Sequence, residues 1–199
     1  MNKKTKLNKA FFKKHEACID GYEWTLSRPD NTVEGTIKEL IDIERIDWAN
    51  WTIARCLNKK QKIQYAVFAA RQVLDIFEKE YPDNKSPRKA IEAAEKCIEH
   101  NTKKNRAAAY AAAASYAASS AASSAASYAA SSASDASYAA SYAASAASYA
   151  SSAASYASYA SYASDAAAYA AYASYAASAS SAKKKMQLKI LDYGLELLK

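Results

Sequence analysis

Between residues 107 and 182 the chain uses only four amino acids, Ala, Ser, Tyr and Asp. Neither Gly nor Pro interrupts this segment, and Ala has the highest intrinsic helix propensity of all residues. Disordered low-complexity segments are usually charged and poor in aromatic residues, whereas this one is rich in Tyr and nearly uncharged. We therefore predict that this segment, which we call the Ala/Ser/Tyr tract, is helical.

The spacing of Tyr within the tract argues against one straight helix, which would extend about 114 Å. Tyr142, Tyr149 and Tyr156 keep one helix face, but Tyr156, Tyr159 and Tyr162 move around the axis by about 60° per step. Pairs of Ser, which can cap helices, interrupt the tract at intervals. These features predict several antiparallel, closely packed helices with Tyr rings at their seams. Silk-like stacked strands are the alternative, which the lack of Gly disfavours.

The rest of the chain has an ordinary composition with helical periodicity. Helices are predicted over 33–43 with Thr32 as cap, after a cap at Asp47, over 61–81, over 86–100 with Pro87 in the first turn, and over 186–199. Three Gly and three Pro in 199 residues are too few for a turn-rich β protein. We predict an all-α fold: a helical globule (1–106), an antiparallel array of Ala/Ser/Tyr helices (107–182) and a closing C-terminal helix (183–199).

Charge and cysteine content restrict the partners and the compartment. The formal net charge is +7, yet every Lys and Arg lies outside the tract, and no nucleic-acid-binding motif accompanies them. The sequence contains no run of large apolar residues long enough to predict a membrane span. The first residues also lack the apolar core of a signal peptide. Three widely spaced Cys fit free thiols in a reducing cytoplasm. No membrane or specific nucleic-acid partner is expected.

Four segments before the tract carry a resemblance to a known family: DWANWTIAR (47–55), YAVFAARQVL (65–74), FEKEYPD (77–83) and PRKAIEAA (87–94). The sequence resembles the immunity-five-like family of bacterial immunity proteins found near polymorphic toxin loci. Members of that family also carry a long Ala-rich tract after this region and then a short closing helix. The tract of this chain departs from the family pattern because it contains much Ser and few Asp. The resemblance implies binding and neutralisation of a protein and carries over no established site.

Aromatic and cationic side chains form one candidate binding set. Arg55 and Arg88 can form a polar cluster in a groove with Trp48 and Trp51, or the arginines can tie helix ends together while the tryptophans fill the core. The Tyr of the tract can fill gaps left by Ala, or act as the rigid amphipathic contacts that interfaces favour. The candidate binding residues are Trp48, Trp51, Arg55, Arg88, Tyr142, Tyr149, Tyr156, Tyr159 and Tyr162.

Two Cys–His pairs, His15 with Cys18 and Cys97 with His100, have the spacing of one helical turn. Adjacent helices would bring the four side chains into a Cys2His2 zinc site, while the alternative is that the cysteines belong to the core. A Cys–His nucleophile lacks a third orienting group, and the isolated glycines form no phosphate loop. No metal ligand, cofactor or catalytic residue is assigned.

Three functions from different classes follow. The leading one is a non-catalytic cytoplasmic protein of immunity type that binds and blocks a partner protein, a toxin. The second is a sponge that sequesters a nucleotide-derived small molecule in pockets lined by Tyr and Arg. The third is a structural or surface-binding role for an Ala-rich helical face. An enzyme is not expected.

Overall fold

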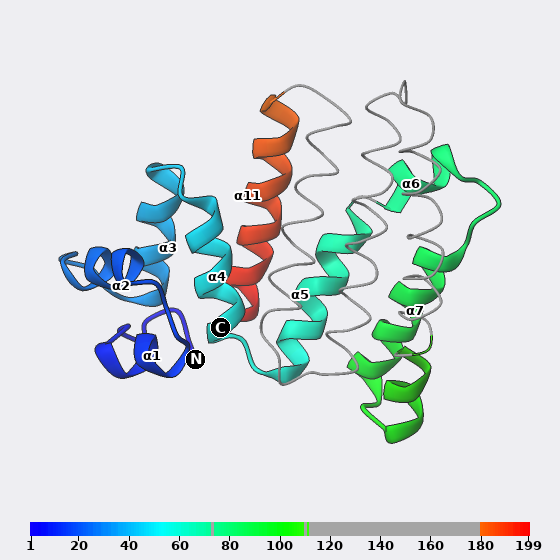
Figure 1. Cartoon of the computed structure of the whole chain (residues 1–199), viewed down its shortest axis with the longest axis horizontal. Helices are drawn as coiled ribbons and strands as arrows, with labels where there is room; N and C mark the ends of the chain where they lie inside the picture. The colour runs from blue at the N-terminus through cyan, green and yellow to red at the C-terminus, as the bar shows by residue number, and fades with distance from the viewer. Residues whose placement is uncertain (73, 110, 112–179) are drawn as a thin grey trace.

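The structure is a computed structural model of the chain and describes residues 1–72, 74–109, 111 and 180–199 (Figure 1). These residues form eight labelled helices and no β-strand, and 103–109 are also helical, so the all-α prediction is confirmed for this part of the chain. Most of the predicted Ala/Ser/Tyr array lies outside the described residues. The helices are α1 (Lys9–Lys14), α2 (Ile19–Leu26), α3 (Val33–Asp42), α4 (Ile46–Cys56), α5 (Lys59–Arg71), α6 (Leu74–Glu80), α7 (Ser86–Glu99) and α11 (Ser180–Leu197).

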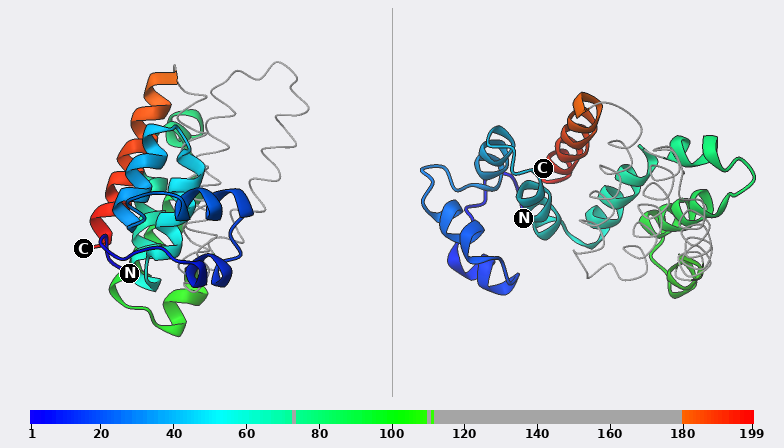
Figure 2. Two further views of the ribbon diagram at one scale, coloured as in Figure 1. Left: turned by 90° about the vertical axis from the view of Figure 1, so that its left-hand side faces the viewer. Right: turned by 45° about the horizontal axis from the view of Figure 1, so that its top comes forward.

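The C-terminal helix packs against the middle of the N-terminal region. Figures 1 and 2 show α1–α3 at one end, α6 and α7 at the other, and α4, α11 and α5 side by side between them. Helix α11 packs against both α4 and α5. The contact is close at Gly194, where an added Cβ atom would lie 2.6 Å from Cγ2 of Ile53 and 2.8 Å from Cε2 of Tyr65. At position 194 only glycine therefore fits against α4 and α5 without displacing these two side chains.

The hydrophobic core runs through α1, α3, α4, α5, α7 and α11. Two polar side chains, those of Tyr65 and Asn50, are buried together in this core. The Tyr65 hydroxyl donates a hydrogen bond of 2.8 Å to Oδ1 of Asn50. Burial raises the pKa of Tyr65 far above its ordinary value, so the hydroxyl keeps its proton. The largest fully buried apolar side chains are Leu7, Val33, Ile37, Leu40, Ile53, Ile63, Ile91, Leu191 and Leu198.

Several predicted helix starts are confirmed. The Thr32 hydroxyl accepts a hydrogen bond from the backbone N–H of Gly35 at 3.1 Å, and Pro87 lies in the first turn of α7. Helix α5 begins before the predicted residue 61, because Asn58 and Gln61 form a reciprocal capping box. Helix α11 likewise begins before the predicted residue 186, because Ala182 and the three lysines that follow it are good helix formers.

The single helix predicted over 61–81 is wrong. Helix α5 ends at Arg71 and α6 begins at Leu74. Each piece is tied to α7 by its own bidentate ion pair, Arg71 with Glu95 and Arg88 with Glu78. Helical periodicity does not encode such tertiary contacts.

The cap predicted at Asp47 is also wrong, because α4 begins at Ile46 with Arg45 at the N-cap position. Helix α3 ends in a Schellman motif, in which the backbone N–H of Arg45 donates to the carbonyl oxygen of Leu40 at 2.8 Å. Glu44 takes the left-handed conformation with φ of 60°, a position where Gly is usual. The resulting tight turn places Asp47 within the first turn of α4 rather than before it.

Candidate functional site

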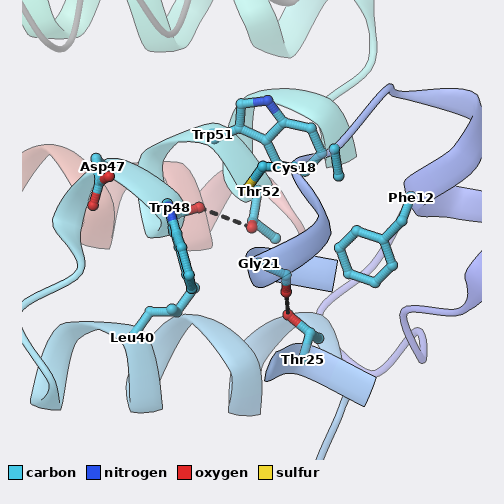
Figure 3. Close-up of a pocket in the computed structure, with 10 residues that line it drawn as sticks. Phe12, Cys18, Gly21, Thr25, Leu40, Asp47, Trp48, Trp51 and Thr52 are labelled. Atoms are coloured by element: carbon cyan, nitrogen blue, oxygen red, sulfur yellow. Dashed lines mark hydrogen bonds between the residues drawn. The ribbon is translucent and has the colours of Figure 1, made fainter. Parts of the chain in front are cut away.

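A groove of about 320 Å³ opens between α1, α2, α3 and α4 (Figure 3). Its walls are mainly aromatic and apolar, and among the side chains that line it Asp47 carries the one negative charge. The size is at the lower end of the range for ligand pockets and suits one or two large side chains. We call it the tryptophan groove; it is lined by Phe12, Ala17, Cys18, Gly21, Thr25, Leu40, Asp47, Trp48, Trp51 and Thr52.

Local sequence explains why the two tryptophans share the groove. Trp48 and Trp51 are three residues apart on α4 and lie on adjacent positions of one helix face. Helix α2 packs directly against this face, since a Cβ atom at Gly21 would lie 3.7 Å from Cδ2 of Trp48, an ordinary van der Waals contact. The two hydroxyl groups near the groove are occupied locally, because Thr25 donates to the Gly21 carbonyl at 2.8 Å and Thr52 to the Trp48 carbonyl at 2.9 Å (Figure 3). The groove therefore offers aromatic faces more than free hydroxyl donors.

Each of the three tryptophans of the chain has an arginine over its ring. The guanidinium carbon lies 3.5 Å from the ring centroid for Arg45 on Trp48 and 4.7 Å for Arg55 on Trp51. The third pair, Arg28 on Trp24, has a separation of 4.9 Å.

Such cation–π contacts hold an indole in place and are worth about 0.5–2 kcal/mol each, depending on exposure. Trp24 also meets Trp48 edge to face at 6.4 Å, so these two pairs are in contact, and Trp51 lines the same groove as Trp48.

Helix α2, which lines the groove through other residues, also carries two exposed apolar side chains. Ile19 is 70% exposed and follows the groove residue Cys18, and Leu26 is 37% exposed and follows the groove residue Thr25. Ile19 and Leu26 are seven residues apart and therefore share one face of α2. Ile43, the C-cap residue of α3, is 46% exposed.

Positive charge gathers near the Trp51 end of the groove. We call Lys14, His15, Arg55, Lys59 and Lys62 the basic cluster; they come from the end of α1, the end of α4 and the start of α5. Burial, and then the charges of Lys14, Arg55 and Lys62, lower the pKa of His15 below its ordinary value. Burial first, and then Arg55, Lys14 and Lys59, lower the pKa of Lys62. Neighbouring cations thus make the protonation of His15 and of Lys62 less favourable.

The structure brings together only some of the residues predicted from sequence. Trp48 and Trp51 line the groove and Arg55 covers Trp51, as the groove interpretation requires. Arg88 does not join them: it lies on α7, at the other end of the described fold, and forms two hydrogen bonds of 2.7 and 2.6 Å to Glu78 (Figure 1). Tyr142, Tyr149, Tyr156, Tyr159 and Tyr162 lie outside the described residues.

Sequence reasoning missed the other two arginine–tryptophan pairs. Trp24 and Arg28 are four residues apart, and Arg45 and Trp48 are three apart, which are the spacings of neighbours on one helix face. This spacing was the feature of the sequence that could have predicted both pairs. The contribution of Phe12 and Cys18 to the groove had no comparable signal, because it depends on how α1 and α2 fold back onto α4.

The possible zinc site is not formed. No group of three or more His, Cys, Asp and Glu side chains among the described residues is placed to hold a metal ion. Cys18 is exposed beside the groove, whereas Cys97 is buried in the core on α7. All three cysteines are free, as the sequence predicts. Burial raises the pKa of the Cys56 thiol to about 12, so this thiol is uncharged and unreactive.

No protein-family model, curated protein or solved structure matches the chain. Among the described helices, none combines the length and the apolar character that crossing a membrane requires.

Proposed function

We propose that this chain is a non-catalytic, immunity-type protein that binds and neutralises a partner protein, a toxin, through the tryptophan groove. The observation that carries the proposal is the set of three partly buried tryptophans, each oriented by an arginine, beside a groove on the surface. Trp and Arg are the residue types that most often dominate the binding energy of protein interfaces. Side chains that are already oriented lose less conformational entropy on binding.

The surface around the groove favours a protein over a small molecule. The exposed side chains of Ile19 and Leu26 lie on α2 outside the groove lining, and a small ligand in the groove would leave them in water. A partner protein covers both the groove and this ridge, and one of its large apolar side chains fills the groove.

The resemblance to the immunity-five-like family supports the same proposal. Its segment 47–55 is the part of the chain that forms most of α4 and carries Trp48, Trp51 and Arg55. The free thiols of Cys18, Cys56 and Cys97 suit a cytoplasmic site of action, where an immunity protein meets an incoming toxin.

The test co-expresses the full chain with each protein encoded next to its gene and takes forward one that is toxic when expressed alone. Co-expression is expected to restore growth, and calorimetry is expected to show a 1:1 complex of the purified proteins. Ile19→Asp places a charge on the exposed ridge, and we expect it to weaken the complex at least about tenfold. Its control is Ala107→Asp, the same change of character at an exposed position of the 103–109 helix.

Both variants are expected to melt like the wild type, since both positions are exposed. Growth rescue without a complex would refute neutralisation by direct binding. Equal loss of affinity in the two variants, or no loss in Ile19→Asp, would refute the groove as the binding surface.

A further inference from the structure

Helix α2 carries a stripe of apolar side chains on its solvent side, at one end of the described fold (Figure 1). Ile19 is the most exposed large apolar side chain among those that the structure describes, and Leu26 is exposed as well. Tyr22 is partly exposed and lies between them, because positions 19, 22 and 26 follow the i, i+3, i+7 spacing of one helix face. Together they form a row about two helical turns long, which water solvates poorly.

The stripe is joined to the tryptophan groove through an aromatic contact. The rings of Tyr22 and Phe12 meet edge to face with 5.7 Å between their centroids, and Phe12 lines the groove. Gly21 and Thr25, on the neighbouring face of α2, line the groove directly (Figure 3). One partner surface can therefore cover the stripe and the groove together.

Helix α2 is acidic in a basic protein. Residues 15–27 form the longest segment outside the tract without Lys or Arg, and they contain Glu16, Asp20 and Glu23. All three residues are exposed, and none forms an ion pair with a described residue. Around the helix, Glu23 and Asp20 follow Ile19 on the side away from the groove. We call Ile19, Tyr22 and Leu26 with Asp20 and Glu23 the outer face of α2.

These charges restrict what can cover the outer face. Charged groups at interfaces are arranged opposite charges of the other sign, so an acidic face selects a basic partner. Nucleic acids and anionic membranes carry phosphate groups, which the carboxylates repel. The Ala/Ser/Tyr tract of the chain itself contains no Lys or Arg that could pair with them. An amphipathic helix presents apolar side chains at the same i, i+3, i+7 spacing as the stripe.

We propose that the outer face of α2 is a docking surface for a basic amphipathic helix of the partner protein. Apolar side chains of that helix pack on Ile19, Tyr22 and Leu26, and its Lys or Arg side chains pair with Asp20 and Glu23. This inference rests on the proposed function and names the chemistry of the partner segment that meets α2 beside the groove.

The probe is a synthetic peptide of two heptads in which Leu forms one helix face and Lys the other. A peptide with Glu in place of Lys reverses the charge, and a peptide with Ser in place of Leu keeps the charge without the apolar face. Each is added to the isotope-labelled full chain while the amide signals are followed by NMR. The Leu/Lys peptide is expected to move the signals of residues 16–26 and to leave those of α7 in place. We expect both control peptides to bind at least about tenfold more weakly.

Two matched variants locate the contact. Glu23→Lys reverses one charge of the outer face, and we expect it to weaken binding of the Leu/Lys peptide about fivefold and to strengthen binding of the Leu/Glu peptide. Glu99→Lys makes the same change at the exposed last residue of α7, and we expect an affinity within about twofold of wild type. Circular dichroism checks that both variants are folded, and sedimentation of the chain alone is expected to show a monomer.

Four results would overturn the proposal. Equal affinity for the Leu/Lys and Leu/Glu peptides would show that the face does not select a basic partner. Equal effects of the two variants, or unmoved signals of residues 16–26, would place the peptide elsewhere. Self-association that Ile19→Asp abolishes would show that a second copy of the chain covers the face.

Failure of this inference and failure of the proposed function have different signatures. Peptide binding at α2 without any toxin complex would refute neutralisation and leave the docking surface in place. A toxin complex that Glu23→Lys does not weaken, from a chain that binds no Leu/Lys peptide, would refute the docking surface alone.

Discussion

Gly194 sits at a close contact between the C-terminal helix and the rest of the described fold, which makes Gly194→Ala an informative substitution. In an open helix this change would stabilise the protein by about 1 kcal/mol, because Ala has the higher helix propensity. Here the new methyl group would lie 2.6 Å from Cγ2 of Ile53 and 2.8 Å from Cε2 of Tyr65. Both neighbours are fully buried and lie on different helices, so neither can move away easily.

The expected result is a net loss of stability. Overpacking of a core costs about 1–3 kcal/mol, and simultaneous overlap with two core side chains places this site at the upper end. After the gain in helix propensity is subtracted, about 2 kcal/mol of the free energy of unfolding is lost. For a chain of this size the melting temperature is then expected to fall by about 4–8 °C.

Gly21→Ala is the matched control. Its added Cβ would lie 3.1 Å from the Sγ atom of Cys18, an exposed side-chain end that can rotate, and 3.7 Å from the ring of Trp48. The expected change is therefore a small gain, up to about 1 kcal/mol, from helix propensity. Thermal unfolding followed by circular dichroism measures both variants. A Gly194→Ala protein as stable as the wild type would refute the close docking of α11 on α4 and α5.

Four further predictions concern single side chains. Tyr65→Phe leaves the buried Oδ1 atom of Asn50 without the hydroxyl that it accepts from, so urea denaturation is expected to show a loss of about 1–3 kcal/mol. Thr36→Val removes a fully buried hydroxyl that has no hydrogen-bond partner in the described structure and is expected to raise the urea midpoint by the equivalent of about 1 kcal/mol. Glu16→Gly relieves a left-handed residue with φ of 51° that ends α1, and we expect a gain of up to about 1 kcal/mol in the melting analysis. The pKa of His15 is lowered in the fold, so the unfolded chain binds its proton more readily; stability is expected to fall as the pH drops below about 6.5, and His15→Gln is expected to flatten this dependence in denaturation measured between pH 5 and 7.5.

The sequence predicts the helices better than their ends and junctions. Thr32 and Pro87 mark helix starts with the residue types that those positions require, and the structure confirms both. The ends of α1 and α3 carry no such mark, because Glu16 and Glu44 occupy the left-handed position where Gly or Asn is usual. The break between α5 and α6 is also invisible in the sequence, since residues 61–81 contain neither Gly nor Pro.

The candidate site shows the same division between local and tertiary information. Trp48, Trp51 and Arg55 share one helix, so their spacing is enough to place them together. Arg88 belongs to a helix that the sequence cannot orient, and the structure gives it a partner, Glu78, far from the groove. The other walls of the groove depend on how α1 and α2 fold back onto α4, and the periodicity of the sequence does not predict this packing.

Helix α4 links the stability of the fold to the proposed binding surface. Its buried face carries Ala49, Ile53 and Cys56, spaced by four and three residues, and Ile53 is the side chain against which Gly194 of α11 is packed. Its other face carries the groove tryptophans, and its last turn carries an arginine of the basic cluster. One helix face is thus held by the C-terminal segment while the opposite face meets the solvent. The two sets of side chains do not overlap. We therefore expect substitutions on the buried face to change the free energy of unfolding, and substitutions around the groove to change the affinity for the partner.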